Sequence, residues 1–430
     1  MTRQSIAGPA RLLALTLAFA PVVSQAQGNA SAAAAAMGGN YTAVARNFNA
    51  VAWNPANLAL PGNSLFSIAL SPQLAMGTGP LTLTDLKEYE GQLVPAPVRE
   101  AWLVKMSENG GQNIGGDVNL TPLALSFGRI AMSATATVRA EGTLPTALAE
   151  LVFFGNAGRT GSATDLVLND LGLNANATST FALAYGRKFG LGPLPDLSIG
   201  VTGKYTIGHA MVSMADNGSV LTSAPLGVVI DVPIVLTDTA SFNNGSGYGL
   251  DVGAAWTFRS IRVGAVLHNV INTFEWNTDK LYYLPVNVTF NESSSETQVD
   301  SLLPLESASP ALQEELRARI GEAKFKPTLV LGVAWSPFRR LTVAADLKQK
   351  VGDSKLELGP NTQVGVGAEL RLIPFIPFRA GFATVGDGMR MSGGLGLELG
   401  ILNLQLAASV LQAEGRSDSG MGFTLSIGGR

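Results

Sequence analysis

Few residues in this sequence have the types and spacing that enzyme chemistry requires. The chain contains two histidines, His209 and His268, which lie far apart in the sequence, and it contains no cysteine. No cluster of Asp, Glu and His shows the spacing of metal ligands, and no Gly-x-Ser-x-Gly segment provides a nucleophile elbow. The glycine-rich run 393–396 lies inside a predicted strand and lacks the setting of a phosphate-binding loop. We therefore predict no catalytic residue, no metal site and no cofactor, and we expect that the protein is not an enzyme.

Nine charged residues could act through their charge, because the alternation described below places them on the less apolar face of predicted strands. They are Lys204, Asp251, Arg262, Asp346, Lys348, Glu369, Arg371, Arg379 and Glu398. Buried charges need partners, so one interpretation is a network of ion pairs that stiffens a wall. The other interpretation is that some basic members guide the head group of an amphipathic ligand. The sequence leaves both interpretations open.

The composition excludes several classes of protein. Hydrophobic residues make up 46 % of the 430 residues and charged residues only 14 %, whereas soluble domains usually contain about 25 % charged residues. The net charge of -3 argues against a strongly basic nucleic-acid-binding protein, so we expect no nucleic-acid partner. The high apolar content argues equally against a disordered chain.

Residues 1–26 have the features of a secretory signal peptide. Two arginines supply positive charge, residues 12–20 form a short apolar segment, and Ser24-Gln25-Ala26 provides the small residues of a cleavage site. A membrane anchor is the weaker alternative, because the apolar segment is short and ends at Pro21. Beyond it no run of about 18 apolar residues occurs, so we expect no transmembrane helix.

A strict alternation of residue types predicts strands that face lipid on one side. In 248–258 every even-numbered residue is apolar, and the odd-numbered ones are Gly, Asp, Ala or Thr. The same period of two occurs in 261–268, 363–372 and 421–428. A soluble sandwich also alternates, but its polar face would be rich in Lys, Glu and Thr, whereas the second face here is mainly Gly, Ala and Ser. This combination favours an all-β transmembrane barrel over a soluble sandwich.

We predict fourteen strands, an even number as in single-chain bacterial barrels. Their ranges are 64–70, 121–127, 130–138, 179–188, 197–207, 247–258, 261–269, 327–336, 341–350, 362–372, 377–384, 389–399, 401–411 and 420–428. Links after even-numbered strands are short and links after odd-numbered strands are mostly long, which predicts periplasmic turns, long outer loops and both termini in the periplasm. We assign the strand-like residues 283–290 to a hairpin within the outer loop 270–326.

Three segments of the outer loops have helical patterns, at 85–106, 146–171 and 309–323. In the last one, Ser309-Pro310 provides a helix start, and apolar residues recur at every fourth position. Such a stripe is usually a packing face; a lid over the mouth or a partner-docking helix is the alternative.

Residues 27–63 precede the first predicted strand and suit a plug folded into the lumen. The small residues 30–36 allow tight packing in a confined space. Asn54 before Pro55 favours an extended or turn conformation and offers an amide that can cap the following turn. A free periplasmic tail is the alternative. The predicted regions are thus a signal peptide at 1–26, a hatch at 27–63 and a barrel at 64–430.

The N-terminal segment resembles the opening of the long-chain fatty acid transporter (FadL-like) family. The resemblance rests on Met-Gly-Gly at 37–39 and on Trp-Asn-Pro-Ala-Asn-Leu-Ala at 53–59, with Asn57 where the transporters usually have Gly. It implies a fourteen-stranded barrel with an N-terminal hatch and passive uptake of hydrophobic molecules. The hatch motif is then Trp53, Asn54, Pro55 and Ala56. Some relatives, the PorV-like proteins, instead serve protein export or surface attachment.

We therefore expect a channel of the bacterial outer membrane that takes up hydrophobic small molecules such as long-chain fatty acids. Its expected partners are outer-membrane lipids around the wall and a hydrophobic ligand in the lumen. The alternative is an outer-membrane scaffold or secretion accessory that binds protein partners through the long loops 71–120 and 270–326.

Overall fold

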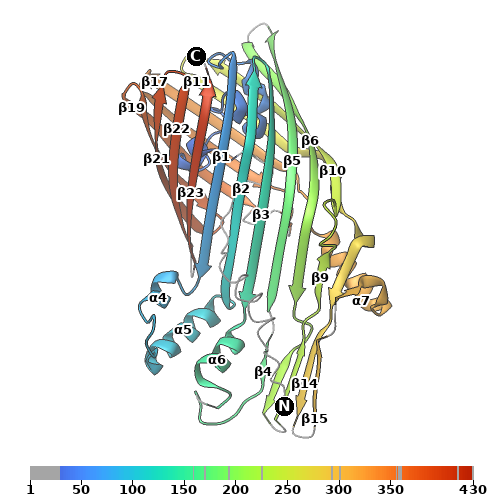
Figure 1. Ribbon diagram of the computed structural model, residues 1–430. Coiled ribbons are helices and arrows are strands. Elements are labelled where there is room, and N and C mark those ends of the chain that lie inside the picture. The colour runs from blue at the N-terminus through green and yellow to red at the C-terminus, as the bar shows by residue number, and fades with distance from the viewer. Residues whose placement is uncertain are drawn as a thin grey trace, which may run out of the picture.

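The computed structural model describes residues 30–157, 159–168, 171–191, 194–223, 226–291, 294–299, 302–354, 356, 361–413 and 416–428. Residues 1–26, the predicted signal peptide, lie outside them. The described chain winds into a tall barrel, with the C-terminus at the end that carries the tight turns and with helices at the opposite end (Figure 1).

The predicted all-β fold with fourteen strands is confirmed, because fourteen antiparallel strands form a closed wall in the described part of the chain. They are β1 (Phe66–Gly79), β2 (Gln112–Phe127), β3 (Ile130–Leu144), β5 (Gly172–Leu191), β6 (Leu194–Ala215), β10 (Gly245–Phe258), β11 (Ile261–Asn272), β17 (Thr328–Phe338), β18 (Leu341–Lys350), β19 (Thr362–Ile373), β20 (Ile376–Val385), β21 (Gly388–Leu399), β22 (Leu402–Ala413) and β23 (Arg416–Gly428). Each pairs with the next in chain order, and β23 pairs with β1. The closed wall leaves no free edge, as a barrel in lipid requires.

The alternation places apolar side chains on the outer surface of the wall. In β19, Val364 and Val366 are 49 % and 44 % exposed, whereas Gln363 of the same strand faces the lumen and is 7 % exposed. The last strand repeats the pattern, with Met421 exposed and Thr424 fully buried. An apolar outer belt on a closed barrel is the surface that a bacterial outer membrane covers in barrels of this kind.

Several strands are longer than predicted, most clearly the first two. The ranges 64–70 and 121–127 extend to β1 and β2, so the first outer connection begins near residue 80 rather than at 71. In β2 the cause is a bulge beside Pro122, where the register shifts against both β1 and β3. This bulge interrupts the period of two in β2, and the strand continues beyond the interruption.

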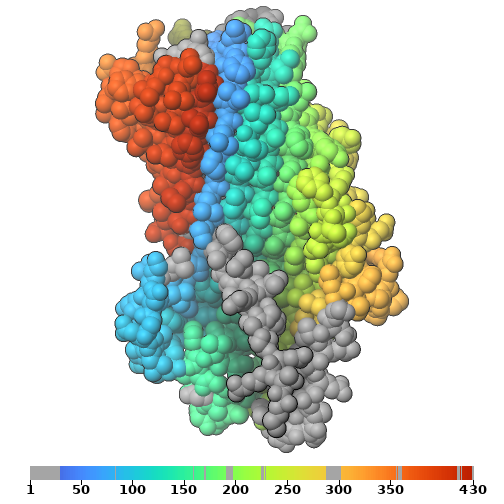
Figure 2. Space-filling model, in the orientation of Figure 1, coloured from blue at the N-terminus to red at the C-terminus, as the bar shows by residue number. Residues whose placement is uncertain are grey.

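The outer connections carry short strands and helices beyond the wall. The helices are α4 (Leu83–Lys87), α5 (Ala96–Glu108), α6 (Thr146–Phe154) and α7 (Pro310–Gly321). A second, five-stranded sheet contains β4 (Leu166–Val167), β7 (Val220–Ser223), β8 (Leu226–Asp231), β14 (Val286–Asn291) and β15 (Ser294–Val299). Figure 2 shows α4 to α6 as a lobe below the wall. Of the helices in the described residues, none is long and apolar enough to cross a membrane.

The segment 283–290 is divided between an extension of the wall sheet and the separate five-stranded sheet. Its first residues belong to β13 (Leu281–Leu284), which pairs with β9 (Ile234–Thr237). The remainder belongs to β14, which pairs with β8 and β15. β14 and β15 form a hairpin of their own, and the wall keeps its even number of strands.

Candidate functional site

The N-terminal segment lies against the inner surface of the wall. It forms α2 (Ala32–Ala36), η1 (Asn47–Asn49), α3 (Ala50–Trp53) and η2 (Pro55–Ala59). α2 contacts β20 to β23, and η2 contacts β5, β6 and β10 on another part of the circumference. These coils appear within the half of the barrel nearer the C-terminus (Figure 1). The described residues of the predicted hatch therefore occupy the half of the lumen that has the short turns, which the sequence predicts to face the periplasm, and their role as a movable hatch is a proposal.

The four residues of the predicted hatch motif are buried and make specific contacts. Asn54 is fully buried; its Oδ1 accepts a hydrogen bond from Ala56 N–H at 3.1 Å, which caps η2, and its Nδ2 donates to Ala254 O of β10 at 3.0 Å. Pro55 and Ala56 pack on Gly200 of β6. The Trp53 ring meets Tyr41 edge to face, with ring centroids 5.5 Å apart. The motif thus turns the segment sharply and attaches it to the wall.

Glycines on the lumen face explain how the segment fits. A Cβ atom on Gly253 would collide with Asn54, and one on Gly367 or Gly381 would collide with Met37. In contrast, a Cβ on Gly203 of β6, which faces outward, would meet nothing within 4 Å. The small residues of the second strand face therefore provide room for the N-terminal segment.

Asp346 of β18 is the wall carboxylate that holds this segment. Its Oδ2 accepts hydrogen bonds from the backbone N–H groups of Tyr41 and Thr42, each at 2.9 Å, and its side chain is buried. Lys348, two residues along the same strand, is partly buried on the lumen side. Hydrogen bonds to a charged acceptor are stronger than neutral ones, so Asp346 is a firm attachment point.

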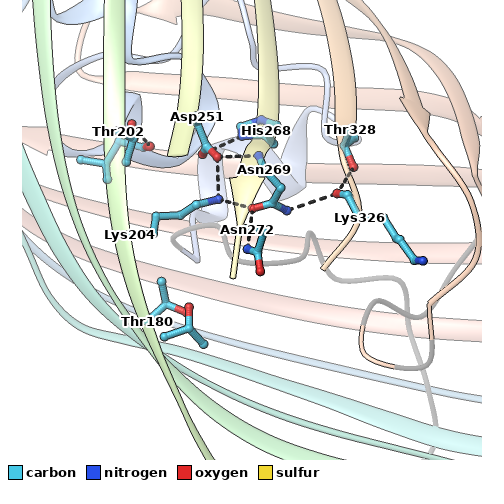
Figure 3. A network of polar contacts seen from close by, with 11 residues as sticks. Thr180, Thr202, Lys204, Asp251, His268, Asn269, Asn272, Lys326 and Thr328 are labelled. Carbon is cyan, nitrogen blue, oxygen red and sulfur yellow. Dashed lines mark hydrogen bonds and ion pairs between the residues drawn. The ribbon is translucent and has the colours of Figure 1, made fainter. Parts of the chain in front are cut away.

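A central network joins three strands just outward of the hatch motif (Figure 3). Lys204 Nζ of β6 lies 2.6 Å from Asp251 Oδ1 of β10, and both side chains are 3 % exposed. The other carboxylate oxygen lies 2.9 Å from His268 Nδ1. Asn269 completes the network, since its N–H donates to Asp251 at 2.8 Å and its Oδ1 accepts from Lys204 at 2.8 Å.

Asn269 occupies a strained position that the network requires. Its φ of 54° lies in the left-handed region, which Asn tolerates better than most residues. The register between β10 and β11 shifts at the same place, around Asp251. This bulge turns the Asn269 backbone N–H toward the carboxylate and also brings Asn269 Nδ2 to 3.2 Å from Lys326 O in the segment that precedes β17.

A second network lies near the periplasmic turns. Arg371 lies between two carboxylates, 2.8 Å from Glu369 and 2.7 Å from Glu398, and it contacts both oxygens of Glu398. Arg379 lies 2.8 Å from Glu369. Arg262 of β11 lines the same end of the lumen. Four of the predicted lumen charges therefore form one paired network.

An apolar cluster closes the outer end of the lumen. Phe274 and Trp276 lie against the lumen face of β6 and β10, where a Cβ on Gly208 would collide with both rings. Helix α7 contributes Leu316 and Ile320, and Phe325 packs edge to face on Phe274. We call this group the outer cap; its buried members are Met211, Val235, Phe274, Trp276, Leu281, Tyr283, Leu305, Ala308, Leu316, Ile320, Ala323, Phe325 and Leu356.

The two histidines lie in different surroundings. His268 points into the lumen as predicted from its strand. His209 lies within β6 rather than after it, at a bulge opposite Ala177 and Thr178. Its Nε2 lies 2.8 Å from Ser179 Oγ and its Nδ1 lies 2.9 Å from Phe242 O. Among the described residues, no group of three or more His, Asp or Glu could hold a metal ion.

Sequence reasoning missed several charged lumen residues, among them an ion pair, Arg46, and the buried Lys350 and Arg390. Arg139 Nε of β3 lies 2.5 Å from Asp117 Oδ2 of β2, and both side chains are buried. The predicted strands cover neither position. Continuing the alternation of 130–138 would have placed Arg139 inward, but continuing that of 121–127 would have placed Asp117 outward, because a bulge in β2 near residue 122 shifts the alternation by one residue. Arg46 was missed because the N-terminal segment has no strand periodicity from which to assign a face.

Comparisons with known proteins give low identities. A family model described as "Family of unknown function (DUF5723)" matches residues 59–232, less than half of the chain. No curated protein matches the sequence. Similar solved structures include the toluene transporter TbuX of Ralstonia pickettii, at 13 % identity and a TM-score of 0.48, covering 94 % of this chain and 99 % of that one.

Two further solved structures are similar over almost the whole chain. The toluene transporter TodX of Pseudomonas putida has 12 % identity and a TM-score of 0.49, covering 93 % of this chain and 97 % of that one. A FadL homologue of Pseudomonas aeruginosa has 12 % identity and a TM-score of 0.45, covering 95 % and 98 %. The chain is thus similar to FadL-like barrels at low sequence identity.

Proposed function

We propose that this barrel takes up small hydrophobic molecules by diffusion through its lumen. Long-chain fatty acids are one class that fits the proposal. The observation that carries it is the outer cap, because aliphatic and aromatic side chains cluster against the lumen face of β6 and β10. An open aqueous channel has a polar lumen instead. An apolar cluster at the mouth offers a hydrophobic molecule a favourable exchange of water for apolar contacts.

The proposed route passes from the outer cap toward the N-terminal segment. Directly inward of the cap lie the central network and then Asn54, which contacts the wall at Gly253 and Gly264. Because these residues fill the lumen, passage requires that the N-terminal segment shift away from β10 and β11. Release then occurs sideways into the membrane or into the periplasm. In this mechanism residues 30–63 act as a hatch.

A disulfide that fixes the hatch to the wall tests the proposal. Asn54 Cγ lies 3.2 Å from the place that a Cβ on Gly253 would occupy, so cysteines at these two positions come within disulfide reach. The chain has no cysteine of its own, so the variant Asn54→Cys/Gly253→Cys forms only this bond. We expect oxidised cells to lose uptake of radiolabelled oleate and of an uncharged aromatic hydrocarbon, and reduction to restore it.

The single variants Asn54→Cys and Gly253→Cys, treated with the same oxidant, are the controls for changes caused by the substitutions alone. Equal uptake by the oxidised and reduced double variant, with the bond verified by mass spectrometry, would refute a moving hatch. Absence of uptake above that of cells without the barrel would refute the transport function itself.

The scaffold alternative is favoured by one feature of the outer lobe. Helices α5 and α6 form a small core of their own around Trp102 and Met106, yet Leu93 and Val152 of this lobe are 91 % and 72 % exposed. Exposed apolar residues on an independent lobe suit a protein partner. Recovery of a secretion complex with the purified barrel, lost on changing both residues to Ser, would support this role.

A further inference from the structure

We propose that the periplasmic end of the lumen holds a binding site for an oxyanion, a carboxylate or a phosphate group, between Arg46 and Arg262. The proposal goes beyond uptake, because binding at this site is measurable without transport. It rests on a cavity, on an imbalance of charge around that cavity, and on the positions of the two guanidinium groups.

The cavity lies between the N-terminal segment and the wall. Its volume is about 350 Å³, at the lower end of the range of small-molecule sites. Its lining includes Gly400, at a short turn, Gly428, at the end of β23, and Tyr41 and Phe48 of the N-terminal segment. A molecule of the periplasm, or one that has passed the hatch, can therefore reach it.

Positive charge exceeds negative charge around the cavity. Four arginines line it, and the acidic residues that line it are Glu369 and Glu398. Both carboxylates are already engaged, since Glu369 contacts Arg371 and Arg379, and Glu398 takes a bidentate contact from Arg371. This paired network is neutral as a whole. The remaining two arginines, Arg46 and Arg262, therefore leave a net charge of two positive units beside the cavity.

The two remaining arginines have no carboxylate at ion-pair distance among the described residues. Two backbone carbonyls of the N-terminal segment hold the Arg46 side chain: its Nη1 donates to Ala45 O at 2.7 Å and its Nε donates to Pro61 O at 3.3 Å. Arg262 extends inward from β11, where Glu369 attracts its charge without lying at ion-pair distance, and it lies close enough to Arg46 to repel the Arg46 charge. An oxyanion between them would replace this repulsion with charge-assisted hydrogen bonds, for which the planar guanidinium group is well suited.

The other side chains around the cavity indicate what the anion carries. Met37, Val44 and Phe48 add a smaller apolar surface beside the arginines, in a lining that is otherwise mainly polar. A small organic carboxylate fits this lining, with its charged group at Arg46 and Arg262 and its small apolar part against these three residues. A phosphate group offers the same oxyanion chemistry and is the other source that the test must distinguish.

Calorimetric titration of the full barrel in a nonionic detergent tests the site with benzoate, with its uncharged analogue benzamide and with inorganic phosphate. We expect benzoate to bind and benzamide not to bind. Arg262→Gln and Arg46→Gln should each raise the dissociation constant for benzoate about tenfold or more, since each removes charge-assisted hydrogen bonds. Arg262→Lys keeps the charge but loses the planar guanidinium group, so its dissociation constant for benzoate should lie between those of the unmodified protein and Arg262→Gln.

Arg339→Gln is the matched control, because it removes the same charge from an exposed turn at the same end of the barrel. Heat-shifted gel mobility shows that each variant is folded, and Arg46→Gln leaves the wall unchanged. Displacement of benzoate by phosphate identifies a general oxyanion site, and no displacement identifies a carboxylate site. Equal binding of benzamide, no binding of either anion, or the same loss in Arg339→Gln would overturn the proposal. Its failure would leave the uptake proposal standing.

Discussion

Replacing Asp251 with alanine should destabilise the barrel more than replacing its partner Lys204. The two charges lie 2.6 Å apart with both side chains 3 % exposed. Asp251→Ala leaves a buried ammonium group without its carboxylate and also removes the acceptor of His268 and of the Asn269 N–H. Leaving one member of a buried ion pair uncompensated typically costs about 3–5 kcal/mol.

The reverse substitution, Lys204→Ala, leaves the network partly intact. Asp251 then keeps the Asn269 N–H at 2.8 Å and His268 Nδ1 at 2.9 Å. The loss resembles that of a hydrogen bond to a charged group, about 1.5–3 kcal/mol. Because the two substitutions remove the same contact, the double variant should cost less than the sum of the single ones.

Urea unfolding of the barrel in phospholipid vesicles, followed by tryptophan fluorescence, gives the free energy of unfolding of each variant. The reasoning fails if Asp251→Ala lies within about 1 kcal/mol of the unmodified protein, since the buried ammonium group would then be solvated in some other way. It also fails if Lys204→Ala costs more than Asp251→Ala, because that result would place the centre of the network on the lysine.

Four other predictions concern the lipid face and the hatch. Val366→Arg should prevent most of the protein from reaching the folded, heat-shifted form on gels, because Arg near the bilayer midplane costs about 2–4 kcal/mol; Val366→Leu is the control, and a normal yield of the Arg variant would contradict the lipid-facing assignment. Gly200→Val should displace the hatch and raise single-channel currents in planar bilayers, whereas Gly203→Val on the outer face of the same strand should not; small currents from both would argue against a lumen-filling hatch. Asp346→Ala should raise these currents as well, since it removes two hydrogen bonds to the hatch, and deletion of residues 27–60 should give the largest currents; no change in either would indicate that the segment does not limit conduction.

The wall was predictable because its signal is local. A period of two along a strand reports which side faces lipid, so Val364 and Gln363 could be assigned to opposite faces from adjacent letters of the sequence. The same rule places Lys204 and Asp251 on the lumen side. It cannot show that they touch, because their contact depends on the register between β6 and β10, which is set by many backbone pairs along both strands.

Tolerance at the lumen face was harder to predict. From the sequence, Gly367 is one of many small residues on the second face, where a hydroxyl would seem harmless. In the structure a Cβ at this position would lie 2.6 Å from Met37 O, so even Gly367→Ser requires the N-terminal segment to move. The requirement for glycine comes from a segment more than 300 residues away in the chain, and no local pattern contains it.

The outer cap, the central network and the hatch motif follow one another along the lumen, and one residue has contacts with all three. The outer cap lies on the outer side of the central network, and the network lies on the outer side of Asn54 of the hatch motif. Asn269 contacts all three levels at once: its N–H and Oδ1 bind the ion pair, its Nδ2 contacts Lys326 O next to Phe325 of the cap, and its strand contacts the hatch at Gly264. Because the ion pair is buried, separating Lys204 from Asp251 requires that water or a ligand supply new polar contacts to both charges. Asn269 therefore connects the ion pair with the backbone next to the cap and with the strand that contacts the N-terminal segment.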